Sequence, residues 1–226
     1  DSAIVSACHQ GIKRGGSTLT ITERPAVNSR QERFTHVQLM KWSELFGKDK
    51  IIVRPFEMQQ FNGGSLFSDF LSLLGLVMSE TFKLPSKRIN AAYRMDALEF
   101  KRLLNLFPVS SLLLPAVDRT LQRYSEQYGR NSDWPYALLS PRQRVRIVQM
   151  YEQDNAWVAR EFLGRQDGRL FYEPLPSPDE DWKLYPGLLP EQVAAIAHFL
   201  KQENPLLFRI LKRIIQAGGR SESLHV

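Results

Sequence analysis

Apolar residues recur every three or four positions along most of the chain, and this spacing predicts a mainly helical protein. Glycine, proline or polar residues separate the periodic segments from one another. The predicted helices cover residues 2–12, 34–46, 66–74, 95–107, 109–128, 141–151 with a continuation through 155–164, 190–202 and 204–217.

Residues that favour helix ends mark two of these segments. Ser65 precedes the helix over 66–74, where a serine side chain accepts a hydrogen bond from a first-turn amide, and Gly75 follows the helix. Gly47 follows the helix over 34–46 in the same way. We expect one face of the helix over 66–74 to be buried, and that face consists of Leu66, Phe67, Phe70, Leu71 and Leu74.

One stretch departs from the helical pattern. Ile51, Ile52 and Val53 are consecutive and β-branched, which predicts a central strand at about 50–54 that is buried on both faces. The segment "STLTITE" (17–23) is either an edge strand or an extended loop. A lone buried strand leaves backbone groups unpaired at about 1–3 kcal/mol each. The strand therefore needs partners, and we expect them upstream of this sequence rather than in its doubtful segments.

Composition excludes some classes of site and leaves the ligand open. The 226 residues include one cysteine, Cys8, which excludes an intramolecular disulfide and a cysteine-based zinc site. The sequence contains no run of about 18 apolar residues, so we expect no membrane-spanning helix in it. The net charge of +6 suits an anionic ligand without selecting one. We expect a cytoplasmic protein, and Asp1 in place of methionine suggests a processed or partial chain.

The segment "GIKRGGST" (11–18) approaches the phosphate-binding pattern G-x-x-x-x-G-K-[ST]. Gly11 and Gly16 have the right spacing, but no lysine precedes the hydroxyl residue, and Lys13 lies inside the segment. No buried strand leads into it, as a phosphate loop requires. A basic surface turn is the better interpretation. The histidines and carboxylates show no metal-ligand or catalytic spacing, so we assign no metal ligand and no catalytic residue.

The helix over 204–217 is amphipathic and basic. Its apolar residues lie on one face, and Arg209, Lys212 and Arg213 lie on the other. This pattern is typical of helices that bind a membrane surface or a protein partner, but an ordinary helix packed on its own domain is the better interpretation. It supports an alternative function for the chain, as a non-enzymatic basic helical module.

Three blocks of sequence resemble the P-loop sulfotransferases, in particular bacterial sulfotransferase-like proteins. The first is "WSELFGKDKIIVRPFE" (42–57), which matches a central parallel strand that ends in arginine and Phe-Glu. The second, "SDFLSLLGL" (68–76), matches the helix after that strand, and the third is "NAWVAREFLGRQDGRLFYEP" (155–174). The resemblance implies an α/β fold with an incomplete parallel sheet.

The resemblance also implies a ligand and two binding residues. Sulfotransferases of this family move a sulfuryl group from 3′-phosphoadenosine 5′-phosphosulfate to an acceptor hydroxyl or amine. The segment "DSAIVSACHQGIKRGG" (1–16) resembles the part of the family that follows the strand with the 3′-phosphate contacts, and Ser6 falls at the serine that contacts this phosphate. Lys13 is a second expected donor contact. The family's phosphate loop has no counterpart here, so we expect this chain alone to be inactive. The implied domain covers 1–175, followed by a proline-rich acidic linker and two helices in 176–226.

Overall fold

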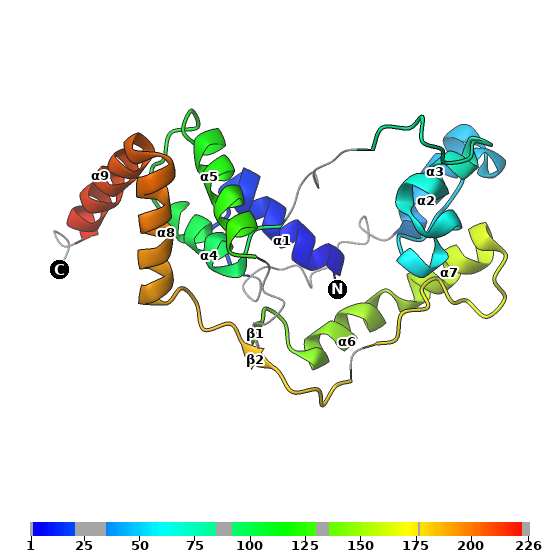
Figure 1. The fold of residues 1–226 in the computed structure, drawn as a ribbon. Helices are drawn as coiled ribbons and strands as arrows, with labels where there is room; N and C mark the ends of the chain where they lie inside the picture. The colour runs from blue at the N-terminus through cyan, green and yellow to red at the C-terminus, as the bar shows by residue number, and fades with distance from the viewer. Residues whose placement is uncertain (1, 21–34, 85–91, 130–135, 176, 223–226) are drawn as a thin grey trace. The chain divides into compact units, whose positions relative to one another are not determined.

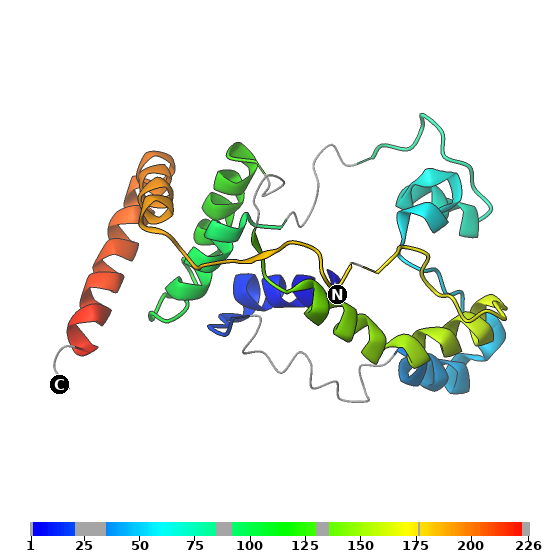
Figure 2. The same ribbon diagram turned by 90° about the horizontal axis from the view of Figure 1, so that it is seen from below.

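The computed structural model describes residues 2–20, 35–84, 92–129, 136–175 and 177–222, and it is predominantly helical (Figure 1, Figure 2). The chain divides into two compact units. Unit 1 contains residues 1–26, 90–140 and 181–226, and unit 2 contains residues 27–89 and 141–180. Each unit is therefore assembled from separate stretches of the sequence. The domain boundary near residue 175 stays a prediction.

The described residues of unit 1 form five helices and one short strand pair. The helices are α1 (Ser2–Gly15), α4 (Met95–Leu104), α5 (Leu114–Gln127), α8 (Pro190–Glu203) and α9 (Pro205–Glu222). In the described part of the chain, the strand pairing consists of β1 (Tyr136–Ala137) and β2 (Lys183–Leu184), which are parallel. Apolar side chains of the helices form its core, with Val117, Leu121 and Ile196 fully buried. α8 and α9 pack against each other as neighbouring helices (Figure 1).

Unit 2 is built around the contact between α2 (Thr35–Phe46) and α7 (Glu152–Leu163). The buried hydrophobic cluster at this contact consists of Leu39, Val158, Ala159 and Leu170. It also contains α3 (Leu66–Leu73), α6 (Pro141–Met150) and three short 3₁₀ helices, η3 (Lys48–Lys50), η4 (Met58–Gln60) and η5 (Asn62–Gly64).

The strand predicted at 50–54 is not formed. Lys50 belongs to η3, and residues 51–57 are extended without a ladder partner among the described residues. Ile51 and Val53 pack on the core of unit 2, but Ile52 is 66 % exposed, so burial on both faces is wrong. Burial alternates with a period of two along 51–57, which is the periodicity of a strand covered on one face. Residues 17–20 of the second candidate strand have no regular structure, and 21–23 lie outside the described residues.

The ends of α3 are as predicted, but its buried face is not. The Ser65 side chain accepts from the Ser68 amide at 3.1 Å, and Gly75 has φ +70°. The Leu76 amide donates to the Leu71 carbonyl and the Gly75 amide donates to the Ser72 carbonyl, which together form a Schellman motif. Four of the five residues expected to be buried are exposed by 45–59 %: Leu66, Phe67, Phe70 and Leu74.

Candidate functional site

Both predicted donor-binding residues lie on α1 in unit 1, and the structure does not bring them together. Ser6 is exposed and Lys13 is nearly buried, with a side chain that is 9 % exposed. Seven residues of helix separate them by about 10 Å along the axis. The segment 11–15 continues α1 rather than forming a turn, because the helix extends to Gly15. The interpretation of "GIKRGGST" as a surface turn is therefore wrong for most of its length.

Lys13 is held by two side chains of unit 1. Its ammonium group lies 4.4 Å from the centroid of the Tyr93 ring and 3.8 Å from Asp118 Oδ1. The Tyr93 hydroxyl donates to the same Asp118 carboxylate, and burial together with this carboxylate raises the Tyr93 pKa. These contacts give Lys13 a structural role in fixing α1, and a donor phosphate would have to compete with Asp118 for its charge.

A second lysine of unit 1 is more deeply buried. Lys101 on α4 is 1 % exposed, and its ammonium group donates to the Ile12 carbonyl at 3.3 Å and to the Asn105 side chain. Burial lowers its pKa, and the nearby charge of Asp118 opposes that effect. Because Asn105 also donates to the Ile12 carbonyl at 3.0 Å, this pair anchors the C-terminal part of α1 to α4.

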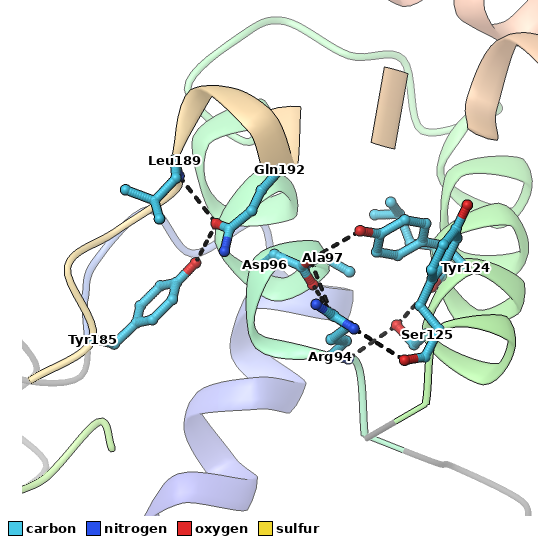
Figure 3. A network of polar contacts seen from close by, with 10 residues as sticks. Arg94, Asp96, Ala97, Tyr124, Ser125, Tyr185, Leu189 and Gln192 are labelled. Atoms are coloured by element: carbon cyan, nitrogen blue, oxygen red, sulfur yellow. Dashed lines mark hydrogen bonds and ion pairs between the residues drawn. The ribbon is translucent and has the colours of Figure 1, made fainter. Parts of the chain in front are cut away.

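The polar network in Figure 3 connects α4 to α5. Asp96 is fully buried and accepts hydrogen bonds from the Arg94 guanidinium at 3.0 and 3.1 Å, from the Tyr124 hydroxyl at 2.9 Å and from the Ala97 amide at 2.8 Å. The Arg94 amide donates to the Ser125 hydroxyl at 2.9 Å. Since every donor around this carboxylate points at it, the network holds the two helices and leaves no carboxylate oxygen exposed for a substrate.

A separate pair of contacts in Figure 3 fixes the start of α8. The Gln192 side chain accepts from the Leu189 amide at 3.0 Å and lies 3.5 Å from the Tyr185 hydroxyl. Burial raises the Tyr185 pKa, and the Asp96 and Glu99 charges add to the effect. The phenol is therefore a neutral hydrogen-bonding group at physiological pH.

In unit 2 a buried glutamate joins segments that lie far apart in the sequence. Glu57 is 8 % exposed, and its carboxylate accepts from the Tyr172 amide at 2.9 and 3.0 Å, from the Glu173 amide at 2.6 Å and from the Gln60 side chain. Burial alone would raise the Glu57 pKa, but these hydrogen bonds outweigh it and the pKa is lowered. The charged carboxylate therefore clamps 172–173 against the extended segment.

An arginine on the opposite face of the extended segment reaches α3. The Arg54 guanidinium donates to both carboxylate oxygens of Asp69, one of them at 3.1 Å, and Asp69 also accepts from the Asn62 amide at 2.8 Å. Asp69 is buried at 3 % exposure, and the Arg54 and Asn62 hydrogen bonds lower its pKa. This ion pair fixes the first turn of α3 to the extended segment.

The three sequence blocks 42–57, 68–76 and 155–174 contact one another within unit 2. Arg54 and Asp69 join the first block to the second, and Glu57 joins the first to the third. Lys48 in the first block forms an ion pair with Glu161 in the third at 2.6 Å. The blocks are spread over 42–174 in sequence and share one unit in the structure.

Sequence reasoning missed most of these anchoring residues. Glu57 and Asp69 are acidic residues inside apolar stretches, and a buried carboxylate needs a hydrogen-bond partner. The sequence does not identify these partners, because they lie 115 residues from Glu57 and 15 residues from Asp69. Asp154 is a further buried carboxylate, but it lies in a polar stretch that gives no sign of burial; it accepts from the Thr35 and His36 amides at 3.1 and 2.8 Å and from the His36 ring at 2.6 Å. It holds the N-terminus of α2 against α7.

Across the described residues, no group of three or more histidine, cysteine, aspartate or glutamate side chains is placed to hold a metal ion. Within the same residues, no helix has the length and apolar content needed to cross a membrane.

Comparison of the chain with protein-family models, curated proteins and solved structures finds no match.

Proposed function

We propose that residues 1–175 form the C-terminal portion of a sulfotransferase-like α/β domain, followed by the linker and two helices of 176–226. The complete domain transfers a sulfuryl group from 3′-phosphoadenosine 5′-phosphosulfate to an acceptor hydroxyl or amine. The donor's phosphate loop comes from polypeptide outside this sequence, and residues 1–226 alone are inactive in transfer. A net charge of +6 suits the anionic donor, because cations and backbone amides must stabilise the charge that develops on the leaving phosphate.

The observation that carries the proposal is the meeting of the three resembling blocks around the extended segment 51–57. Here Glu57 binds the backbone of the third block, and Arg54 binds the helix of the second. The period-two burial of 51–57 also suits a strand that joins a sheet.

Ser6 is the better of the two candidate donor contacts. Its hydroxyl group is exposed on α1, whereas Lys13 is engaged with Tyr93 and Asp118. We therefore assign the 3′-phosphate contact to Ser6. The positive charge of Lys13 attracts the anionic donor without contacting it directly.

Calorimetric binding of adenosine 3′,5′-bisphosphate to the full-length gene product that contains residues 1–226 tests the function. We expect binding, and we expect Ser6→Ala to weaken it by about tenfold, as for the loss of a hydrogen bond to a charged group. Ser111→Ala, which changes another exposed serine of unit 1, is the matched control and should bind as the unmodified protein does. Absence of binding heat from the unmodified full-length protein contradicts the proposal.

The alternative function, a basic helical module that binds a membrane or a protein, rests on α9. Leu207 and Leu211 on its apolar face are 2 % exposed, and α9 packs on α8. Part of the apolar face is thus already covered within unit 1, which leaves Arg209, Lys212 and Arg213 as the exposed basic residues. We therefore place the alternative second.

A further inference from the structure

The end of α7 and the loop that follows it bring three arginines of unit 2 close to one tyrosine. Arg160 lies in the last turn of α7, and Arg165 and Arg169 lie in the loop. The Cζ atoms of Arg165 and Arg169 are 4.9 and 5.3 Å from the centroid of the Tyr172 ring. Both contacts are cation–π interactions, so one aromatic ring orients two positive charges.

Arg165 uses its donors to hold the loop in place. Its guanidinium group donates to the Arg169 and Leu170 carbonyls at 3.0 and 3.1 Å and to the Gln60 side chain at 2.7 Å. Gln60 also donates to the Leu170 carbonyl at 2.9 Å and to the buried Glu57 carboxylate. The loop therefore has a fixed conformation, and Arg165 acts as a positioning residue within it.

Gly168 lets Arg160 approach the backbone of the same loop. Its φ is +70°, and a Cβ atom added at this position would lie 3.0 Å from Arg160 Nη2 and 3.2 Å from Ala156 Cβ. Only glycine leaves this space open without strain. The Arg160 guanidinium group therefore lies against the residue that directly precedes Arg169.

The charges of Arg160 and Arg169 are not neutralised within the described parts of the chain. Both residues are exposed, and neither guanidinium group forms an ion pair or a hydrogen bond with another described residue. The neighbouring Glu161 pairs with Lys48 at 2.6 Å, and Asp167 accepts from the Arg169 backbone amide at 3.0 Å. Two like charges held close together repel each other, and an anion that contacts both is attracted to them.

We propose that Arg160 and Arg169 bind a tetrahedral oxyanion, as free sulfate or phosphate or as the charged group of a small-molecule ester. A guanidinium group binds two oxygens through parallel N–H donors. One such fork occupies both oxygens of a carboxylate, whereas a sulfate or phosphate group has further oxygens for a second arginine. The site belongs to unit 2 and goes beyond the donor contact assigned to Ser6 of unit 1.

Nuclear magnetic resonance titration of the backbone amides of the full-length gene product tests the inference. The probes are inorganic sulfate, glucose 6-sulfate and adenosine 3′,5′-bisphosphate, each at an ionic strength of about 0.15 M, which screens distant charges. We expect at least one probe to shift the amides of 165–172 in a saturable way. The probe that binds most tightly identifies the source of the oxyanion as a free ion, a sugar ester or a nucleotide.

Three substitutions of arginine by glutamine locate the site. Arg160→Gln and Arg169→Gln should each weaken binding of that probe by about tenfold, as for the loss of a hydrogen bond between charged groups. Arg146→Gln removes the same charge from an exposed position of α6 in the same unit and is the matched control. It should change binding by less than about threefold.

The outcomes separate this inference from the proposed function. Equal weakening by all three substitutions, or no saturable shift of 165–172 with any probe, overturns the inference. Binding of adenosine 3′,5′-bisphosphate that Arg160→Gln and Arg169→Gln leave unchanged, without binding of either sulfate probe, overturns it and leaves the proposed function intact. Binding of a sulfate probe that both substitutions weaken, without nucleotide binding, supports the inference and contradicts the sulfotransferase function.

Discussion

Single carboxylates with several donors fix the relative positions of distant segments inside each unit. Glu57 binds the 172–173 backbone, Asp154 binds the first amides of α2, and Asp96 binds α5 through Tyr124. Each is buried, so its desolvation has to be offset by hydrogen bonds. Losing a buried acceptor therefore costs more than an average surface contact contributes.

Glu57→Gln is expected to lower the free energy of unfolding of unit 2 by about 1–3 kcal/mol at pH 7, because an amide replaces a charged acceptor of two backbone N–H groups. The Glu57 pKa is lowered in the folded protein, so its stabilisation is complete above its ordinary value of 4.5 and is lost as the pH falls through the folded pKa. The difference between variant and unmodified protein should thus shrink below pH 4.5.

Urea unfolding followed by tryptophan fluorescence measures this difference when Trp134 and Trp182 of unit 1 are replaced by phenylalanine, because Trp42 and Trp157 of unit 2 then give the signal. Glu80→Gln, at an exposed position of the same unit, is the control and should change little at either pH. A Glu57→Gln penalty that is the same at pH 7 and pH 4 would show that the carboxylate charge is unimportant.

At the scale of elements, local signals located the helices well. The end signals of α3 depend on residues within one turn, and both Ser65 and Gly75 perform the predicted roles. The final helices were predicted at 190–202 and 204–217 and are Pro190–Glu203 and Pro205–Glu222. Periodicity also identified the apolar face of α3, but it carries no information on whether the same polypeptide covers that face.

Substitutions of Gly75 test how much the C-terminal end of α3 contributes to stability. Its φ of +70° lies in the left-handed region, and an added Cβ meets nothing within 4 Å, so strain in the backbone is the cost of substitution. We expect Gly75→Ala to lower the free energy of unfolding by about 1–2 kcal/mol and Gly75→Asn to cost less, because asparagine tolerates this conformation. Equal losses for the two variants in urea unfolding would exclude this explanation.

Alanine substitutions of two leucines of α9 test whether this helix is packed within unit 1. Leu211 is 2 % exposed and Leu206 is 61 % exposed on the same helix. Leu211→Ala is expected to lower the free energy of unfolding by about 2–4 kcal/mol, whereas Leu206→Ala should change it by less than about 0.5 kcal/mol. Thermal unfolding measured by circular dichroism checks both, and a Leu211→Ala variant as stable as Leu206→Ala would show that α9 is not packed on α8.

At the scale of the whole molecule, the predominance of helix was predictable from the sequence. The structure of the predicted strand at 50–54 was not. Three β-branched residues at 51–53 predicted burial on both faces, yet one face alone is covered by α2 and α7. Contacts such as Glu57 with Tyr172 span 115 residues, and no local pattern encodes them. For the candidate site, the resemblance named only the single positions Ser6 and Lys13, and their role stays a prediction. The contacts of Lys13 with Tyr93 and Asp118 were not predictable, because these residues lie far along the chain.

The uneven distribution of exposed apolar side chains leads to a prediction for residues 1–226 studied alone. Phe67 and Phe70 of unit 2 lie on one helix beside other exposed apolar residues, whereas Leu106 and Leu112 of unit 1 lie outside helices. A dye such as 8-anilinonaphthalene-1-sulfonate binds extended apolar surfaces better than scattered side chains. The double variant Phe67→Ser with Phe70→Ser should therefore reduce dye fluorescence by at least about half, with unchanged circular dichroism. Leu106→Ser with Leu112→Ser removes side chains that are equally or more exposed and should reduce it much less. An equal reduction from both double variants would mean that the exposed side chains of α3 do not form an extended apolar surface.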